Sequence, residues 1–409
     1  MGIATSVEAL TTLLTLGGLV YMLLALWSAR DFGHAWRRSL RAAAADSAAF
    51  AADVTILKPM KGVDSRLHAG LVSHCRQQYA GNFEILFGVS SLDDPAVAEI
   101  ERLRAEFPNC AIRLIECPQR LGTSGKVSNL IQMLRQASYP YILINDSDIR
   151  VSPNYLARVM ACFGAAAGIG AAAGIKDPKV GMVTAPYLGR TAADGNGLTL
   201  WARLEALGIS TDFMPGVLTA RRLEGGIRFG LGSTLAVSRE ALTASGGLEP
   251  LVDYLADDYE LGARVARAGY RVELSTEVVE TGIPAYDWHG FGQHQSRWSR
   301  TVRDASPWGY AGLVFTHGLG WAVLNVLASG LSPVSLWLLG LSFFLRLTLA
   351  MMVGAEVLGD HQVLPGLWLL PLRDMVAMGV WAAGFAGNSI VWRGEEFVLK
   401  SGRLHRAGG

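Results

Sequence analysis

Two aspartates separated by one serine follow a short apolar run. Residues 142–151 read ILINDSDIRV, so Asp146 and Asp148 come just after apolar residues that stop at Asn145. Two carboxylates held this close repel each other unless a cation lies between them. Their oxygens suit a hard divalent ion such as Mg²⁺ or Mn²⁺, which proteins commonly share with substrate phosphates. The alternative is an ordinary turn at the end of a strand, because Asp and Ser are common turn residues.

Two further stretches place charged side chains at predicted helix starts. LGTSGKVSNL (121–130) sets Gly and Ser before a helix with Lys126 in its first turn. Free amides and a lysine there suit a diphosphate, although an ordinary capped surface helix explains the stretch equally well. LADDYELGARVARAGYRVEL (255–274) puts Asp257 and Asp258 at the start of an amphipathic helix. Carboxylates also stabilise helix N-termini. That effect readily explains one of these two aspartates, but less readily the presence of both.

A basic helix is expected near residue 300. HQSRWSRTVR (294–303) places Arg297, Arg300 and Arg303 at three-residue spacing, with Trp298 beside them. That spacing puts the three arginines on one helical face. The face could contact a phosphorylated ligand, or it could simply face phospholipid.

The elements that must position these residues alternate between strand and helix. The pattern predicts buried strands at 54–59, 83–90, 110–117, 141–145 and 181–187, and helices at 95–107 and 126–137. Such alternation is typical of βαβ units and a parallel sheet, with ligands bound beyond the carboxyl ends of the strands. Residues 164–175, GAAAGIGAAAGI, are interpreted as a loop or insertion. The ends of the first, second and fourth strands carry Lys58, Asp93–Asp94 and Asp146.

Composition points away from a plain soluble enzyme. The 409 residues are 51% hydrophobic and only 17% charged, and the net charge of +1 gives no reason to expect nucleic-acid binding. The four cysteines form no C-x-x-C pair, so neither a zinc site nor a redox motif is indicated, and they are interpreted as reduced thiols.

The hydrophobic residues are concentrated at the two ends. Residues 9–29 carry no charge and are long enough to span a bilayer. Arg30, Arg37, Arg38 and Arg41 follow, and the positive-inside rule places them in the cytoplasm. Up to three further segments are expected near 311–330, 333–355 and 374–392.

The basic residues after 392 create a conflict, because three further spans would leave them outside. We expect one segment to lie in the interface instead, and favour 308–330, which holds Trp308, His317 and Trp321.

Taken together, the motifs resemble a known signature. Asp94, Asp146-Ser-Asp148, Asp257–Asp258 and the final x-x-x-R-W resemble the D, D-x-D, D, Q/R-x-x-R-W pattern of family 2-like inverting glycosyltransferases with the GT-A fold. KVSNL, NDSDIRV, LADDYELG and HQSRWSRTVR resemble more narrowly the ceramide glucosyltransferase family (family 21), which includes bacterial hopanoid-associated glycosyltransferases. The likeness covers roughly residues 54–305 and extends more weakly to LPLRD (370–374) and WRGEEF (392–397).

The resemblance implies a membrane-bound inverting enzyme that moves a sugar from a UDP-sugar to a lipid hydroxyl. Glucose transfer to ceramide, giving a β-glycosylceramide, is the first expectation. The alternatives are N-acetylglucosamine transfer to a hopanoid and a processive polysaccharide synthase. A protein of another class, a transporter or anchor whose soluble domain only binds nucleotide, is disfavoured because almost all ionisable residues lie outside the hydrophobic segments.

The resemblance also assigns roles to residues. It implies Asp146 and Asp148 as the ligands of Mg²⁺ or Mn²⁺, Asp258 as the general base, and Arg297 with Trp298 closing over the diphosphate and acceptor. The expected donor-binding set comprises Lys58, Asp93, Asp94, Lys126, Asp146, Asp257 and His294. The chain departs from the family at His294, Ser124 and Ser91, where Gln or Arg, Asn and Asp are usual.

The expected organisation is an α/β GT-A domain between membrane helices. We expect an integral, multi-pass protein, in the inner membrane of a bacterium, with its catalytic domain in the cytoplasm. The segments are a transmembrane helix at 1–30, a basic linker at 31–53, the catalytic domain at 54–305, a C-terminal membrane region of two to three segments at 306–392, and a basic cytoplasmic tail at 393–409.

Overall fold

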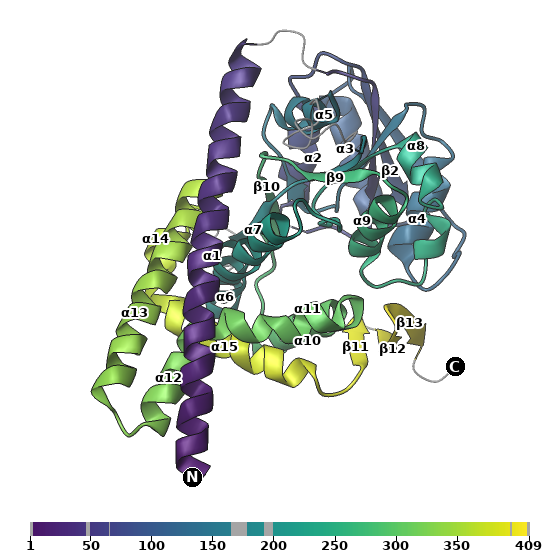
Figure 1. The fold of residues 1–409 in the computed structure, drawn as a ribbon. Coiled ribbons are helices and arrows are strands. Elements are labelled where there is room, and N and C mark those ends of the chain that lie inside the picture. Colours follow the sequence, from purple (N-terminus) through teal and green to yellow (C-terminus); the bar gives the residue numbers. More distant parts are fainter. Residues whose placement is uncertain are drawn as a thin grey trace. The chain divides into compact units, whose positions relative to one another are not determined.

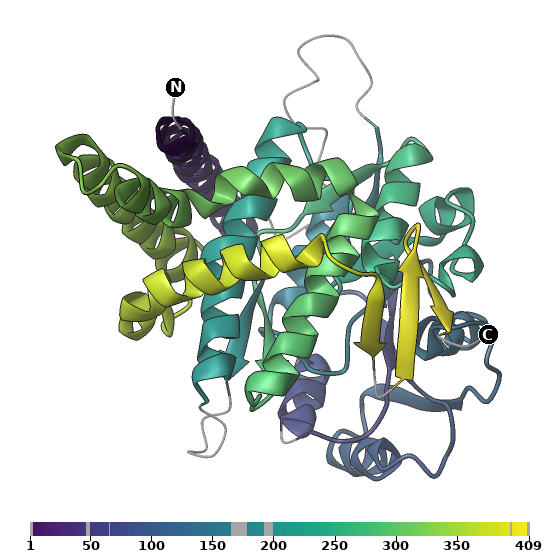
Figure 2. The ribbon, with the colours of Figure 1, turned by 90° about the horizontal axis from the view of Figure 1, so that it is seen from below.

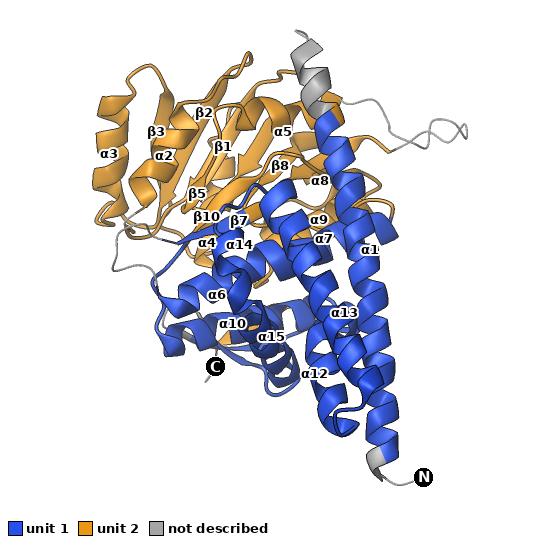
Figure 3. Cartoon of the chain, turned by 90° about the vertical axis from the view of Figure 1, so that its left-hand side faces the viewer, with its two compact units in different colours: residues 1–37, 188–224, 283–401 blue, residues 38–187, 225–282, 402–409 orange. Residues whose placement is uncertain are grey.

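A computed structural model describes residues 3–45, 50–64, 66–164, 178–191, 199–392 and 395–406 (Figure 1). The chain divides into two compact units (Figure 3). We call residues 1–37, 188–224 and 283–401 the helical unit, and residues 38–187, 225–282 and 402–409 the sheet unit. Each unit is therefore assembled from separate stretches of the chain.

A seven-stranded sheet forms the centre of the sheet unit. Its order is β3-β2-β1-β4-β8-β6-β9. β1, β2, β3 and β4 are parallel neighbours, whereas β8 is antiparallel to both β4 and β6. The bounds are β1 Val54–Pro59, β2 Phe83–Val89, β3 Ala111–Glu116, β4 Tyr141–Ile144, β6 Val180–Thr184, β8 Leu235–Ser238 and β9 Arg271–Leu274. The predicted mostly parallel α/β sheet is confirmed.

The strand order creates a switch point between β1 and β4. From β1 the chain builds outward through β2 and β3, and then returns to add β4 on the other side of β1. The carboxyl ends of strands that diverge in this way leave a crevice in which α/β proteins bind ligands. Lys58 at the end of β1 and the residues that follow β4 lie at this switch point.

Helices connect these strands. They are α2 Leu67–Cys75, α3 Ala96–Glu106, α4 Gly125–Leu134, α5 Tyr155–Gly164, α8 Arg239–Ala244, η3 Glu249–Leu251 and α9 Asp257–Arg267. Ser124 caps α4, because its hydroxyl accepts the Val127 amide at 3.3 Å. A short strand β5 Ile149–Arg150 pairs antiparallel with β10 Val279–Ile283. Apart from Gly164, the glycine- and alanine-rich stretch 164–175 lies outside the described residues.

The predicted strand at 181–187 is wrong in its extent. β6 ends at Thr184 and a separate strand, β7 Tyr187–Thr191, begins after Ala185 and Pro186. Proline lacks an amide hydrogen and interrupts a strand ladder, which explains the break.

The helical unit contains the apolar C-terminal elements and the long first helix as far as Arg37, while the last residues of that helix, 38–45, belong to the sheet unit. The elements of the helical unit are α1 Ile3–Ala45, α6 Leu200–Gly208, η2 Ile209–Phe213, α7 Met214–Leu223, α10 Trp288–Ala305, α11 Pro307–Gly312, η4 Leu313–His317, α12 Gly318–Ala328, α13 Pro333–Ala350, η5 Met351–Val357, α14 Val363–Gly366, η6 Leu367–Leu369, α15 Leu370–Gly384, β11 Ser389–Trp392 and β12 Glu395–Lys400. One apolar cluster joins several of them, with Leu204, Phe291, Ala350 and Leu370 at its centre.

Among the residues that the structure describes, four helices are long and apolar enough to cross a membrane. They are Thr5–Arg38, Pro307–Ala328, Pro333–Val357 and Val363–Gly384. The expected basic linker at 31–53 is corrected, because α1 continues without a break to Ala45. The run from Arg41 to Ala45 consists of strong helix formers, so nothing in it ends the helix.

The expected segment at 374–392 is also corrected. The apolar helix ends at Gly384, Gly387 has a positive φ of 71°, and residues 389–392 form β11, which pairs antiparallel with β12. The expected tail at 393–409 is not a free tail, because β12 and a further strand, β13 Arg403–Arg406, lie in it. Apolar residues of β11 extend the hydropathy signal past the true helix end.

Candidate active site

The turn after β4 carries the two aspartates and is held from behind by Asn145. Asn145 is fully buried, and its side-chain amide donates to the Tyr155 hydroxyl at 2.9 Å and to the Ser233 carbonyl at 2.6 Å. These bonds connect the end of β4 to α5 and to the loop before β8. Asp146 and Asp148 are therefore presented from a fixed turn at the switch point.

Lys58 lies beneath this turn. It has no exposed surface, and its ammonium donates to the Asp146 carbonyl at 2.9 Å. Burial lowers the pKa of Lys58 to about 8, while the charges of Asp148 and Asp146 act in the opposite direction. His74 is also fully buried nearby, and burial, together with the charge of Lys58, lowers its pKa to about 3. The histidine is thus neutral and the lysine supplies the positive charge.

The Asp148 carboxylate accepts a hydrogen bond from the Thr281 hydroxyl of β10 at 2.5 Å. Burial, and then the neighbouring charge of Asp146, raise its pKa. The ionised form of Asp148 is therefore held at a cost in free energy, and a cation at this position would lower that cost.

Lys126 joins two of the expected acidic groups. Its ammonium lies 2.9 Å from Asp146 Oδ1 and 3.1 Å from Asp257 Oδ2. Burial acts to lower the pKa of Lys126, but the charges of Asp146, Asp257 and Asp258 outweigh it, and the pKa is raised. The start of α4 and the start of α9 thus meet at the turn after β4.

Asp258 occupies the first turn of α9. Burial, and then the charge of Asp257, raise the pKa of Asp258 to about 6. A Cβ built on Gly232 would lie 3.0 Å from Asp258 Oδ2 and 3.2 Å from Asp146 Oδ2. Two carboxylates therefore converge over a residue that has no side chain. The glycine between them was not identified from the sequence, because it carries no chemistry of its own.

Asp93 and Asp94 lie at the other side of β1. Asp94 Oδ1 accepts the amides of Gly62 and Ala96, each at 2.9 Å, so it joins the loop after β1 to the start of α3. Asp93 is exposed and accepts a hydrogen bond from the Ser91 hydroxyl at 3.3 Å. The structure gives Asp94 a local capping role at the carboxyl edge and does not join either residue to Lys126.

The arginine motif belongs to the helical unit, on α10. His294 Nδ1 lies 3.1 Å from Glu205 Oε2, and Glu205 is 3% exposed. The ring of Trp298 lies 5.1 Å from that of His294. Arg297 lies one turn along from His294 on the same helix.

Two other arginines of this helix have structural partners. Arg300 and Arg303 donate to the backbone carbonyls that follow α15, such as Ala386 and Gly384. These two arginines therefore cap the end of another helix.

The donor set at the switch point fits a divalent cation. Four carboxyl groups oppose two ammonium groups there, namely Asp146, Asp148, Asp257 and Asp258 against Lys58 and Lys126. Across the described residues, no three His, Cys, Asp or Glu side chains are grouped to hold a metal. Hard cations that take ligands from one or two carboxylates complete their coordination with water and substrate phosphates, so the carboxylates of Asp146 and Asp148 are compatible with such an ion.

Comparison with known proteins agrees with this geometry. The sequence matches Glycosyl transferase family 21 over residues 10–405. Ceramide glucosyltransferases 1 and 3 of Caenorhabditis elegans are 24% and 25% identical to it over 364 residues, covering 85% of this chain and 72% and 73% of theirs.

A solved structure shows the same fold. The mannosyltransferase PcManGT from Pyrobaculum calidifontis, in complex with GDP-Man and Mn²⁺, superposes with a TM-score of 0.51 at 18% identity, covering 93% of this chain and 97% of that one. The expected GT-A fold and the resemblance to ceramide glucosyltransferases are confirmed. The chain belongs to glycosyl transferase family 21 and is a glycosyltransferase.

Proposed function

We propose that this enzyme transfers a sugar from a UDP-sugar to the hydroxyl of a membrane lipid, with glucose as the sugar and ceramide as the lipid. The observation that carries the proposal is the convergence of Asp146, Asp258 and Lys126 at the switch point of a GT-A sheet. Support for a lipid acceptor comes from the related ceramide glucosyltransferases and from four helices apolar enough to enter a bilayer.

The donor end of the site binds a diphosphate. Lys126 at the start of α4 meets its negative charge, and Lys58 adds a buried positive charge beneath the turn. Asp146 and Asp148 would hold Mg²⁺ or Mn²⁺, which supplies Lewis-acid stabilisation of the leaving UDP when bound. Asp257 keeps Lys126 oriented, and Asp93 and Asp94 line the nucleotide end. The role of His294, Arg297 and Trp298 at the diphosphate rests on the family motif.

Asp258 is the proposed general base. A base works best when its pKa lies close to the working pH, and the pKa of about 6 leaves Asp258 ionised at neutral pH while keeping it basic. It accepts the proton of the acceptor hydroxyl as that oxygen attacks the anomeric carbon. The bond between the sugar and UDP breaks in the same displacement, so an α-linked donor gives a β-linked product.

We infer a cytoplasmic catalytic site from the arginines that follow the first apolar segment, because the positive-inside rule favours the cytoplasm for such residues. Arg30 and Arg37 lie on α1 after the charge-free residues 9–29. In a bacterium this membrane would be the inner membrane.

The test is a transfer assay with defined donors and acceptors. Membranes holding the wild-type protein, Asp258→Asn or the exposed control Asp64→Asn are incubated with UDP-glucose or UDP-N-acetylglucosamine and with ceramide or a hopanoid lipid. Mass spectrometry of the lipid extract identifies the product, and UDP release is measured in parallel. A glucosylated ceramide from the wild type and the control, and none from Asp258→Asn, supports the proposal. A hopanoid product would change the acceptor, a polymer would indicate a processive synthase, and no UDP release with any lipid would indicate a nucleotide binder.

A further inference from the structure

The last described strand constrains how the C-terminal helices cross the membrane. Within the sheet unit, the Leu404 amide donates to the Asp253 carbonyl at 2.8 Å, and the Leu255 amide donates to the Gly402 carbonyl at 3.2 Å. Residues 253–255 and 402–404 are therefore on the same side of any bilayer. The chain between them must cross an even number of times, yet it contains three of the four candidate spans. At least one candidate does not cross.

Two of the three candidates run along α1: α12 through the contacts described next, and the helix α13–η5 through Glu356, which lies 3.5 Å from Arg37. A Cβ on Gly18 would lie 2.3 Å from the Cα of Gly318, and the Thr12 hydroxyl donates to Asn325 Oδ1 at 2.9 Å. From the first contact to the second, the residue number falls in α1, from 18 to 12, and rises in α12, from 318 to 325, so the two helices are antiparallel. The two glycines permit the close approach that is typical of membrane helices. α12 then turns at residues 329–332 into α13 (Figure 1). The turn thus lies toward the N-terminal end of α1.

We call α1 and the hairpin of α12 and α13 the bundle. The third candidate runs across this bundle. In Figure 2 α1 is seen almost along its axis, whereas α15, in yellow, shows its full length. α15 packs on α11, because the Tyr310 hydroxyl donates to the Trp381 carbonyl at 2.7 Å and Trp381 Nε1 donates to the Tyr310 carbonyl at 3.0 Å.

Both ends of Val363–Gly384 contact the end of the α12–α13 hairpin that lies away from the turn at residues 329–332. At its start, Val363 packs against Gly354 in η5, which lies at the end of α13 away from the hairpin turn and still contacts α1 there, since Glu356 lies 3.5 Å from Arg37. At its end, Arg303 donates to the Gly384 carbonyl at 2.6 Å, and Arg303 directly precedes the chain that enters α11 and α12. A helix attached at both ends to the same side of the bundle has no route across the bilayer.

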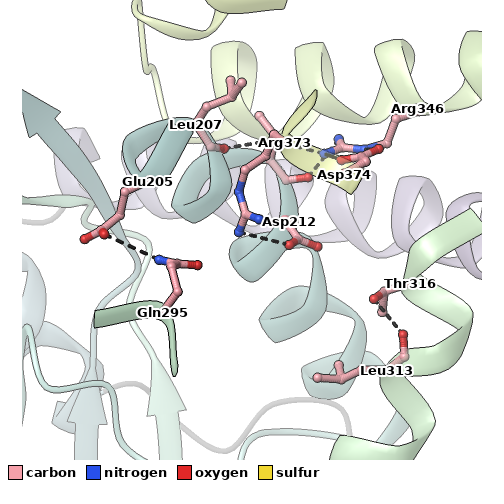
Figure 4. Close-up of polar contacts among 10 residues, drawn as sticks. Glu205, Leu207, Asp212, Gln295, Leu313, Thr316, Arg346, Arg373 and Asp374 are labelled. Atoms are coloured by element: carbon pink, nitrogen blue, oxygen red, sulfur yellow. Dashed lines mark hydrogen bonds and ion pairs between the residues drawn. The ribbon is translucent and has the colours of Figure 1, made fainter. Parts of the chain in front are cut away.

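The polar face of this candidate is turned into the protein (Figure 4). Asp374 accepts two hydrogen bonds from Arg346 of α13, each of 2.8 Å, and Arg373 lies 3.4 Å from Asp212 of η2. Arg346 also donates to the Thr211 carbonyl at 2.9 Å. Ionisable groups in membrane segments require such partners.

The opposite face is entirely apolar. The exposed side chains Leu364, Trp368, Leu372 and Met375 are 53%, 68%, 43% and 37% accessible, and their spacing of four, four and three residues places them on one helical face. No residue from 363 to 386 that is exposed carries a polar side chain. Trp308 in the neighbouring α11 is 90% exposed, and tryptophan is enriched at the bilayer interface.

We propose that Val363–Gly384 lies in the interface of the bilayer, with its apolar face in the lipid and both of its ends on one side. α1, α12 and α13 are then the helices that enter the membrane, and the crossing number between residues 255 and 402 is even. This proposal differs from the expectation that 308–330 is the interfacial segment. The proposal concerns only whether both ends of Val363–Gly384 lie on the same side of the bilayer. It can therefore fail while the proposed reaction and the cytoplasmic orientation hold.

The first test compares the two ends of the segment. Single cysteines are introduced at His361 and Ala386, both exposed, and at Leu331 in the hairpin turn. Sealed vesicles of either orientation are treated with a membrane-impermeant maleimide, and modified peptides are identified by mass spectrometry, which separates them from the native cysteines. His361→Cys and Ala386→Cys should react in the same vesicle orientation, and Leu331→Cys should not react in that orientation. Reaction of His361→Cys and Ala386→Cys in opposite orientations would overturn the proposal.

The second test measures depth along the segment. Nitroxide labels are placed at Leu364→Cys, Met375→Cys and Ala382→Cys, and their collisions with oxygen and with a water-soluble nickel complex are compared in liposomes. Eleven helical residues span about 16 Å, roughly half of a bilayer core, so a crossing helix would show its greatest depth at residue 375. An interfacial helix should give the same shallow depth at all three. Protection from both reagents would mean that protein, such as a second copy of the chain, covers the face, and would overturn the bilayer as its partner.

Discussion

Replacing Asp258 by Asn should weaken catalysis and strengthen the fold at neutral pH. The proposed base must be ionised to accept a proton, but burial and the charge of Asp257 make the ionised form of Asp258 unfavourable in the native state. Asn has the same shape and can still accept the Tyr259 amide, which donates to Asp258 Oδ1 at 2.8 Å. The substitution therefore removes the unfavourable charge together with the base.

The size of the stabilisation follows from the pKa of Asp258. The shift from 3.8 to about 6 corresponds to roughly 3 kcal/mol, since one pKa unit is about 1.4 kcal/mol. Because the native pKa is raised, the carboxyl group favours the folded state below pH 3.8, and that stability is lost as the pH rises through about 6. The figure is an upper bound, because Asp258 is partly exposed to solvent.

The assay compares purified wild-type protein, Asp258→Asn and the exposed control Asp64→Asn in detergent without donor or metal. Tm of Asp258→Asn should exceed that of the wild type at pH 8, and the difference should shrink as the pH approaches 4. Transfer should fall by about 10²–10⁴-fold while UDP binding by calorimetry is retained. The control should change neither quantity. A variant less stable than wild type at pH 8, or one with near-wild-type turnover, would refute the reasoning.

Three other outcomes are expected. Wild-type kcat should rise with pH up to about 6 and then level off, because Asp258 must be ionised to accept a proton; a flat profile from pH 5 to 8 would contradict its role. EDTA should abolish transfer and Mg²⁺ or Mn²⁺ should restore it, with Asp148→Ala losing metal-dependent donor binding in calorimetry; full activity in excess chelator would exclude the metal. Gly232→Ala should lower kcat by about 10²-fold with little change in Tm, because the new Cβ would lie 3.0 Å from Asp258 Oδ2 and displace it; unchanged transfer would show that the two carboxylates need not converge.

Much of the sheet could be predicted because its strands are buried on both faces. Such strands appear in sequence as continuous apolar runs, and VTILKP became β1 with the predicted bounds. The helix start at Asp257 was also predicted correctly. Once the strands are parallel, their carboxyl ends meet at one edge, so Lys58 and Asp146 were expected there, whereas the contacts of Lys126 with Asp146 and Asp257 are known only from the structure.

The remaining features depend on contacts between distant residues. Gly232 matters because two carboxylates meet above it, and Asn145 because its amide reaches Ser233; neither contact has a local pattern. Hydropathy alone also extended the last apolar helix past Gly384 into β11, since both are apolar. The π-helical turn at 209–213 lies between α6 and α7, and the sequence pattern does not distinguish it from an α-helix.

The hydrogen bonds between residues 402–404 and 253–255 also set an order of events during synthesis. The ribosome delivers Asp257 and Asp258 well before it delivers β13, and every apolar helix after residue 306 emerges in between. Residues 253–255 therefore lack their hydrogen-bond partners, residues 402–404, until those helices have been synthesised. Domains usually fold as units while the chain is being synthesised, and the N-terminal domain folds first. In this discontinuous unit, completion of the candidate site therefore waits for synthesis of the apolar helices, so a nascent chain stalled before residue 402 should be incompletely folded around α9.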